Sequence, residues 1–194
     1  MSSNDWDDYA EEWDTNDDVN RYSEKAFDAL TTALSIDNLR ILDFGCGTGL
    51  LSEKLAHQAN FIVALDPSTK MIEVLRNKKI KNVDTIAEEL TSELISKNHL
   101  LQQKFDLIVC SSALAFVPEY EKTLTLLTHL LKGSGYLVQW DWYKEEGEEG
   151  SGFSKQQVKD AFESAGLSKV AVTIPFSMQA GNNAMDVIMG IGYL

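Results

Sequence analysis

Two acidic residues and a run of glycines have the types and spacing that could bind a charged ligand. Asp43 stands two residues before Gly45, which begins an alternation with Gly47 and Gly49, and Asp66 follows the next apolar run. Glycine allows the backbone to approach a ligand closely, and a helix that begins after such a turn offers free amide groups to anionic oxygen atoms. The arrangement predicts a site for a nucleotide-like cofactor.

The spacing of these residues distinguishes between cofactors. A dinucleotide fingerprint requires Gly-x-Gly-x-x-Gly, and Leu50 occupies the third glycine position when the count starts at Gly45. Asp66 stands at the separation from the turn at which an acid binds the hydroxyls of an unphosphorylated ribose. Asp43 would repel a pyrophosphate but attract an ammonium or a sulfonium group. S-adenosylmethionine carries both cations, so the sequence favours it over NAD.

The elements that must position these residues alternate between strand and helix patterns. Buried strands are expected at Ile41–Phe44, Phe61–Leu65, Val83–Ala87, Phe105–Cys110 and Tyr136–Trp140. Helical periodicity separates these runs, which is typical of a parallel sheet with crossover helices. The last two apolar runs, 169–178 and 185–194, flank the turn-prone segment Ala180–Asn183 and predict a hairpin. The predicted fold is α/β, with a single doubly wound, mostly parallel seven-stranded sheet, helices on both faces and a C-terminal antiparallel hairpin.

One helix can be bounded from its own residues. Leu124, Leu127 and Leu131 share a face at helical spacing. Pro118 suits the first turn of such a helix, and Gly133 suits its end. We therefore expect a helix that contains Leu131 and stops at Gly133.

The chain resembles the class I (Rossmann-like) S-adenosylmethionine-dependent methyltransferases, in particular the small type 11/12 methyltransferase domains. The resemblance covers nearly the whole chain and is carried by ILDFGCGTG at 41–49, ALDPSTKMIEVLR at 64–76 and FDLIVCSSALAFVPEYEKTLTLLTHLLKGSGYLV at 105–138. It implies transfer of a methyl group from S-adenosylmethionine to a small-molecule acceptor by in-line displacement. A non-catalytic S-adenosylmethionine-binding partner or regulatory subunit is the alternative, followed by a nucleotide-binding oxidoreductase.

The resemblance also implies which residues bind the cofactor. Asp43 and the glycine turn would hold its methionine end, and Asp66 would hold the ribose. Pro67 and Met71 would flank the adenine, and a backbone carbonyl at Ser111 would accept from its amino group. The complete implied set is Asp43, Gly45, Cys46, Gly47, Asp66, Pro67, Met71, Glu88, Glu89 and Ser111.

Three of these acids have structural alternatives. Glu88 and Glu89 would also be favoured in the first turn of a helix, because the helix dipole attracts negative charge without any ligand. Asp66 would also serve as the cap of the helix that follows it.

If the acceptor is a hydroxyl or an ammonium group, a base must remove its proton, and the candidates are Asp141, Tyr143 and Tyr9. Asp141 and Tyr143 alternate with Trp140 and Trp142 at the end of a predicted strand, so the two pairs should point in opposite directions. One pair would then face the substrate. The alternative is an ordinary strand end with aromatic cover.

The N-terminal segment combines aromatic and acidic residues. Trp6, Tyr9 and Trp13 lie among aspartates and glutamates, and aromatic side chains in a segment this polar need a surface to cover. We expect residues 1–35 to form a helical lid and residues 36–194 to form the Rossmann-like core, together one domain at 1–194.

Composition limits the possible partners. The chain has 194 residues, 44% of them hydrophobic, and a formal net charge of −13. One sizeable core is expected at this length. A nucleic acid is an unexpected partner because phosphate binding depends on clustered Lys and Arg. The acceptor is therefore expected to be a small molecule, with a protein side chain as the alternative. No feature of the sequence specifies the oligomeric state.

The sequence shows no pattern for membrane insertion, secretion or metal binding. No apolar run reaches membrane-spanning length and the acidic start lacks a signal pattern, so we expect a cytoplasmic protein without a membrane partner. Cys46 and Cys110 do not have disulfide or zinc spacing, and His57, His99 and His129 do not have metal-ligand spacing. No metal is expected.

Overall fold

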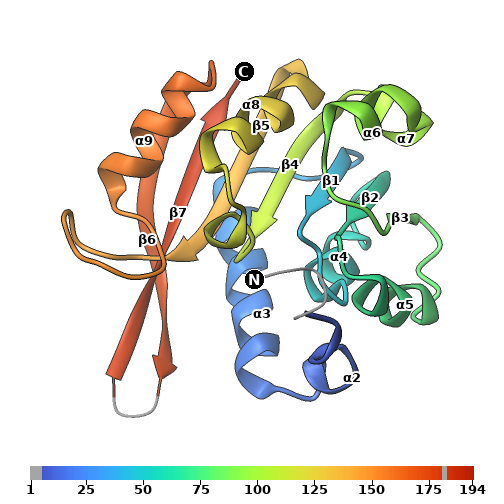
Figure 1. Ribbon diagram of the computed structural model, residues 1–194, viewed down its shortest axis with the longest axis horizontal. Helices are drawn as coiled ribbons and strands as arrows, with labels where there is room; N and C mark the ends of the chain where they lie inside the picture. The colour runs from blue at the N-terminus through green and yellow to red at the C-terminus, as the bar shows by residue number, and fades with distance from the viewer. Residues whose placement is uncertain (1–5, 181–182) are drawn as a thin grey trace.

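The computed structural model describes residues 6–180 and 183–194 and contains a seven-stranded sheet with the order β3-β2-β1-β4-β5-β7-β6 (Figure 1). The strands are β1 (Arg40–Phe44), β2 (Phe61–Leu65), β3 (Val83–Ile86), β4 (Phe105–Ser111), β5 (Leu131–Trp142), β6 (Ser168–Ala180) and β7 (Asn183–Tyr193). β1 to β5 pair in parallel, whereas β7 pairs antiparallel with both β5 and β6. The predicted fold class, including the C-terminal hairpin, is confirmed.

The predicted turn of that hairpin, Ala180–Asn183, includes residues 181 and 182, which lie outside the described residues. The two strands beside it are long, and they extend past the neighbouring end of β5 in Figure 1. Because β7 lies between β5 and β6, the hairpin brings the paired residues Met178 and Met185 to the end of the sheet where β5 finishes at Trp142.

Helices cover both faces of the sheet. They are α2 (Ala10–Trp13), α3 (Asp17–Ala33), α4 (Leu50–Leu55), α5 (Thr69–Asn77), α6 (Ser92–Lys97), α7 (His99–Gln102), α8 (Tyr120–Leu130) and α9 (Lys155–Ser164), with a 3₁₀ helix, η1, at Leu114–Phe116. Successive residues of a strand point to opposite faces. Leu42 accordingly belongs to a buried cluster with α8 and α9, while Ile41 belongs to a second cluster with α3 and α4. Burial on both faces explains why these strands are continuously apolar.

The boundary between α8 and β5 differs from the prediction. α8 ends at Leu130, and Leu131 begins β5, where it is buried and pairs with Phe105 of β4. Gly133 therefore lies within a strand rather than after a helix, and Pro118 precedes the first helical residue, Tyr120. Leu131 pairs with β4 and is buried, and these contacts make the segment extended although its apolar residues have helical spacing.

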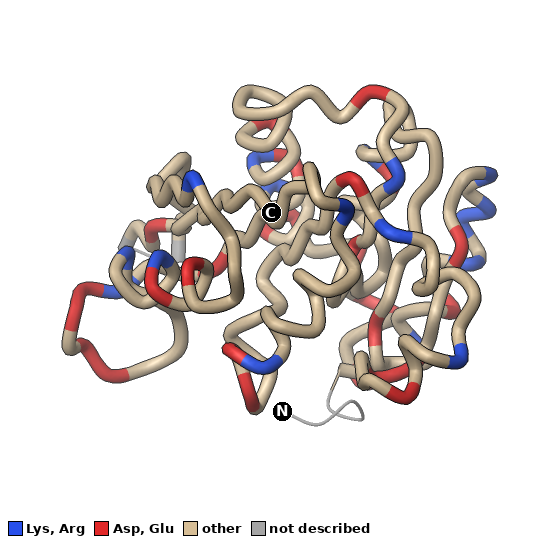
Figure 2. Tube along the Cα trace, turned by 90° about the horizontal axis from the view of Figure 1, so that it is seen from above, with Lys and Arg blue, Asp and Glu red and all other residues tan. Residues whose placement is uncertain are grey.

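Acidic positions outnumber basic ones over the whole trace (Figure 2), as the composition of 30 acidic and 17 basic residues requires. Across residues 6–180 and 183–194, no helix combines the length and the hydropathy that a membrane crossing needs.

Candidate active site

A cavity of about 720 Å³ opens where β1, β2 and β4 end. After β1 the chain builds β2 and β3 on one side, and it then returns to build β4 and β5 on the other side. The strand order thus reverses between β1 and β4, which is the position where open α/β sheets bind their ligands.

Asp43, near the end of β1, lies in the wall of this cavity and is only 1% exposed. Its Oδ2 accepts a hydrogen bond from the Ser52 hydroxyl at 2.6 Å. Burial raises the pKa of Asp43 to about 6, because the ionised form is poorly solvated. A cation placed against this carboxylate would favour its ionised form.

Gly45 and Gly47 of the turn are glycines for different reasons. Gly45, Gly47 and Gly49 all have a positive φ, at 67°, 54° and 80°, which favours glycine over other residues. A Cβ atom on Gly45 would lie 2.4 Å from the Cβ of Ala113, so the protein itself needs glycine there. A Cβ atom on Gly47 would meet no heavy atom closer than 3.9 Å. Gly47 therefore leaves space for a ligand beside the backbone.

Asp66 joins the end of β2 to the glycine turn. Its Oδ2 accepts from the amide of Gly47 at 2.9 Å, and its Oδ1 accepts from the amide of Ser68 at 2.8 Å. The cap of α5 is Ser68, whose hydroxyl accepts from the amide of Met71, so Asp66 does not occupy the cap position. A carboxylate can accept about four hydrogen bonds, which leaves Asp66 with free acceptor capacity in the cavity wall.

The structure brings most of the other predicted cofactor residues to the same cavity. Cys46, Pro67, Met71, Glu89 and Ser111 line it. Burial and the charges of Asp43 and Asp66 raise the pKa of the Cys46 thiol, so this cysteine is a poor nucleophile.

Glu88 is exposed and does not line the cavity. Glu88 and Glu89 also do not open a helix, because α6 begins at Ser92 after the cap Thr91, whose hydroxyl accepts from the amide of Leu94 at 3.0 Å. The structural alternative for these two acids, a place in the first turn of a helix, is therefore wrong.

None of the predicted bases lines the cavity. Asp141 is buried near the end of β5, where its Oδ1 accepts from the amide of Ala115 at 3.4 Å and its Oδ2 from Gln139 Nε2 at 3.1 Å. Burial raises the pKa of Asp141 to about 8. Tyr9 is 52% exposed, and Tyr143 lies beside Glu145, which raises its pKa.

The tryptophans at the end of β5 differ from one another. Trp140 is fully buried in the core, whereas Trp142 lines the cavity. Trp142 packs on Tyr22 of α3, and the hairpin, which also contacts α3, contributes the paired residues Met178 and Met185. Together with Ser112 and Phe116, which line the same cavity, we call these residues the distal half. Of this group, only Trp142 is predicted from the sequence as a possible substrate contact. The methionines come from the hairpin and Tyr22 from α3, so no local pattern connects them.

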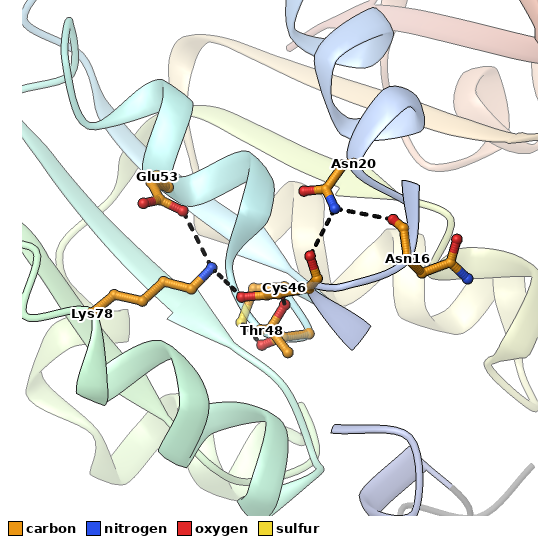
Figure 3. Close-up of polar contacts among 8 residues, drawn as sticks. Asn16, Asn20, Cys46, Thr48, Glu53 and Lys78 are labelled. Carbon is orange, nitrogen blue, oxygen red and sulfur yellow. Dashed lines mark hydrogen bonds and ion pairs between the residues drawn. The ribbon is translucent and has the colours of Figure 1, made fainter. Parts of the chain in front are cut away.

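The N-terminal segment covers one side of the cavity. Trp6 and Trp13 line it, and the Trp6 ring lies edge-on to Phe116 with 5.1 Å between ring centroids. Asp14 anchors the segment, because its Oδ1 accepts from the Thr48 hydroxyl at 2.5 Å and its Oδ2 lies 2.8 Å from Lys78 Nζ (Figure 3).

The same anchor includes the start of α3. The Asn20 side chain donates to the backbone carbonyls of Asp14 and Asn16, and Lys78 also pairs with Glu53 of α4 at 3.2 Å (Figure 3). The N-terminal segment is thus tied directly to the glycine turn and to the two helices behind it.

The residues present fit S-adenosylmethionine better than a dinucleotide. Among the described residues that line the cavity, none is Lys, Arg or His, so a pyrophosphate would meet no cationic side chain. Asp43 instead presents a buried carboxylate that a cation would stabilise. No cluster of three His, Cys, Asp or Glu side chains suited to a metal occurs within the described part of the chain.

Comparisons with known sequences agree with this geometry. Residues 35–182 match the family described as Methyltransferase domain. The chain is 32% identical over 110 residues to the ubiquinone biosynthesis O-methyltransferase of Haemophilus ducreyi. That alignment covers 55% of this chain and 47% of the relative. The chain is 29% identical over 157 residues to an uncharacterized methyltransferase of Schizosaccharomyces pombe, and the alignment covers 69% of this chain and 55% of the relative. The chain spans about half the length of the curated relatives it matches.

Solved structures share the fold at low sequence identity. A complex of DhpI with SAM and HEP has a TM-score of 0.74 at 17% identity, covering 96% of this chain and 94% of that one. A chain from the complex between a Haloferax volcanii methyltransferase and its activator has a TM-score of 0.76 at 15% identity, covering 97% and 96%. The chain therefore belongs to the methyltransferase domain family, with the fold of the class I S-adenosylmethionine-dependent methyltransferases.

Proposed function

We propose that this chain transfers a methyl group from S-adenosylmethionine to a small-molecule acceptor by in-line displacement. The observation that carries the proposal is that the residues suited to the cofactor and the distal half belong to one continuous cavity. A donor and an acceptor bound in that cavity would meet without crossing a protein wall. When bound, S-adenosylmethionine supplies a methyl group on a sulfonium, which is a good leaving group.

The residues that would hold the cofactor have distinct roles. Asp43 would pair with its ammonium group, and the open backbone at Gly47 would admit its methionine end. Asp66 would accept from the ribose hydroxyls with the capacity that the Gly47 and Ser68 amides leave free. Met71 and Pro67 would flank the adenine. Glu88 lies outside the cavity, so we leave it out of the proposed set.

The protein's contribution to the reaction would be alignment and exclusion of water. The predicted bases Asp141, Tyr143 and Tyr9 do not line the cavity, so we assign none of them a direct proton transfer. Holding two reactants in line converts a bimolecular reaction into an effectively unimolecular one, which is worth about 7–11 kcal/mol in favourable cases. That contribution needs rigid walls rather than a strong base.

A small molecule is supported as the acceptor by size and by charge. The cavity volume of about 720 Å³ lies within the range of small-ligand sites. The net charge of −13 disfavours a nucleic acid. The name of the Haemophilus ducreyi relative supports an oxygen atom as one class of methyl acceptor. The cytoplasmic location expected from the sequence stays a prediction.

We further propose that residues 1–35 act as a lid over the cofactor. The support comes from the described part of this segment, where Trp6 and Trp13 line the cavity and Asp14 contacts Thr48 of the glycine turn. A lid at this place would keep water away from the reacting atoms.

Turnover with isotope-labelled S-adenosylmethionine tests the proposed function. The purified chain is incubated with fractionated metabolite pools, and labelled product and S-adenosylhomocysteine are measured together. We expect both to form in equal amounts with at least one fraction. Cofactor binding without turnover over a broad acceptor panel would instead support the non-catalytic alternative, which the open distal half does not favour.

A further inference from the structure

The distal half has aromatic walls whose rings pack against other rings. The Trp142 ring lies 5.7 Å from the Tyr22 ring at an interplanar angle of 69°, and Tyr22 packs in the same way on Phe176 at 5.5 Å. Phe116 is held edge-on by Trp6. Rings fixed against one another in this manner present flat apolar surfaces, and such surfaces complement flat apolar ligands.

Charge restricts the ligand further. The charged side chains among the described lining residues are Asp18, Asp43, Asp66 and Glu89, all of them acidic. A carboxylate or phosphate on the acceptor would find no cationic side chain here, and these four acids would repel it. An apolar wall also gives no compensation for removing such a group from water.

Ser112 is a polar residue of the distal half. It follows β4 directly and has a φ of 52°, a left-handed conformation that is uncommon for a non-glycine residue. Its amide donates to the Trp140 carbonyl at 2.7 Å, which fixes the backbone at the end of the sheet. Strained residues of this kind persist where the surrounding structure holds them in place, often at functional sites.

A second polar group lies near Ser112. The Tyr22 hydroxyl is buried and has no hydrogen-bond partner among residues 6–180 and 183–194. Burial and the negative charge of Asp141 raise the pKa of Tyr22, and the nearby Ser112 hydroxyl lowers it by a smaller amount. A buried hydroxyl without a partner has lost its hydrogen bonds to water and gained none in return. A polar atom of a ligand bound at Ser112 would give this pair of hydroxyls a third member.

We propose that the distal half binds a flat, largely apolar molecule without negative charge, and that Ser112 positions its nucleophilic atom. The inference rests on the function proposed above and specifies its acceptor. Ser112 acts here as a positioning residue, and the aromatic walls determine specificity.

Binding of matched aromatic probes tests the charge rule. Naphthol and naphthoate share one ring system and differ in charge at neutral pH, and calorimetry can measure both with and without saturating S-adenosylhomocysteine. We expect naphthol to bind at least about tenfold more tightly than naphthoate, because the acidic lining repels the naphthoate carboxylate. Equal binding, or tighter binding of naphthoate, would overturn the proposal.

A lysine placed in the distal half should change this preference. Met185 is 40% exposed and lines the cavity, so Met185→Lys would bring a cation to the wall without burying it. We expect this variant to gain affinity for naphthoate. Ala184→Lys is the matched control, since Ala184 is an exposed neighbour on the same strand that does not line the cavity. An equal gain in both variants would indicate general electrostatics and would contradict the proposal.

Replacement of Ser112 separates positioning from structure. Ser112→Gly removes the hydroxyl and suits the positive φ, so we expect an unchanged or higher Tm, with naphthol affinity reduced about three- to tenfold and naphthalene affinity unchanged. Lys79→Gly is the backbone control, because Lys79 has a φ of 54° and lies outside the cavity. Unchanged naphthol affinity in Ser112→Gly would overturn the role of Ser112.

Binding of S-adenosylhomocysteine tests the proposed function separately from the ligand preference of the distal half. S-adenosylhomocysteine that does not bind would contradict the function, while the probe preference measured without it would still decide the chemistry of the distal half. S-adenosylhomocysteine that binds normally to a protein without the probe preference would overturn this proposal alone.

Discussion

The amide of Gly47 donates a hydrogen bond to the carboxylate of Asp66, with 2.9 Å between the nitrogen and Oδ2. This contact joins the glycine turn after β1 to the end of β2, and both residues line the cavity. Asp66 therefore orders the turn as well as offering acceptor capacity to a ligand. Substitution of Asp66 should affect both the free protein and the bound state.

Asp66→Asn should weaken S-adenosylhomocysteine binding by about 1.5–3 kcal/mol, the range for hydrogen bonds to a charged group. It should also lower the Tm of the free protein, because the amides of Gly47 and Ser68 lose a charged acceptor. Calorimetry and thermal unfolding measure the two effects. Asp84→Asn, at an exposed position on β3, is the control. An unaltered affinity for S-adenosylhomocysteine would remove Asp66 from the proposed cofactor site.

The affinity for S-adenosylhomocysteine should depend on pH through Asp43. The pKa of Asp43 is raised to about 6, so the carboxylate gains its charge as the pH rises through that value. Only the ionised form pairs with an ammonium group, so affinity should increase between about pH 5 and about pH 7 and then level off.

Asp43→Asn should remove that pH dependence and bind at every pH about as weakly as the wild type does at low pH. The stability of the free protein should change with pH in the opposite direction. An acid whose pKa is raised by folding costs stability as the pH rises, so the wild type should lose stability between about pH 4 and about pH 6. A pH profile of affinity that is the same in both proteins would show that Asp43 does not meet the cofactor.

Two glycines of the turn should respond differently to alanine. Gly45→Ala places a Cβ atom 2.4 Å from Ala113, so we expect a clear loss of Tm. Gly47→Ala meets no such contact and should cost about 1–2 kcal/mol through its positive φ, while the methyl group narrows the cavity and lowers cofactor affinity. Unfolding curves and calorimetry on both variants check this difference. A Gly47→Ala protein with unchanged affinity would contradict the close approach of the ligand at this position.

The lid should be held by Asp14. Asp14→Ala removes the contacts with Thr48 and Lys78, so we expect faster hydrogen exchange across residues 6–18 and weaker protection on addition of S-adenosylhomocysteine. Glu11→Ala, at an exposed position of α2, should leave the exchange unchanged. Exchange in the wild type that does not respond to the ligand would show that the segment is not a lid.

Local sequence predicted the part of the site that is built from short segments. Asp43 and Gly47 lie within one strand-turn unit, and Asp66 ends the next strand, so spacing alone indicates that they converge. The distal half could not be predicted in this way. Tyr22 and Met178 meet only because β7 inserts between β5 and β6, which brings the hairpin beside α3.

The two wrong predictions, for Leu131 and Asp141, also result from contacts that local sequence does not show. Leu131 keeps helical spacing with Leu124, but pairing with Phe105 draws it into β5. Asp141 has the chemistry of a base, but its hydrogen bonds to Ala115 and Gln139 turn it away from the cavity. In both cases a contact with a distant part of the chain outweighs a local pattern.

A direct comparison of S-adenosylhomocysteine and NAD in one calorimetric titration series tests the central claim that this cavity binds an adenosylmethionine-type cofactor. The buried carboxylate of Asp43 and the lack of cationic side chains among the described lining residues favour the first ligand. We predict tight, saturable binding of S-adenosylhomocysteine that Asp43→Asn weakens at neutral pH, and little or no binding of NAD. Tighter binding of NAD, or equal binding of both ligands, would contradict the account.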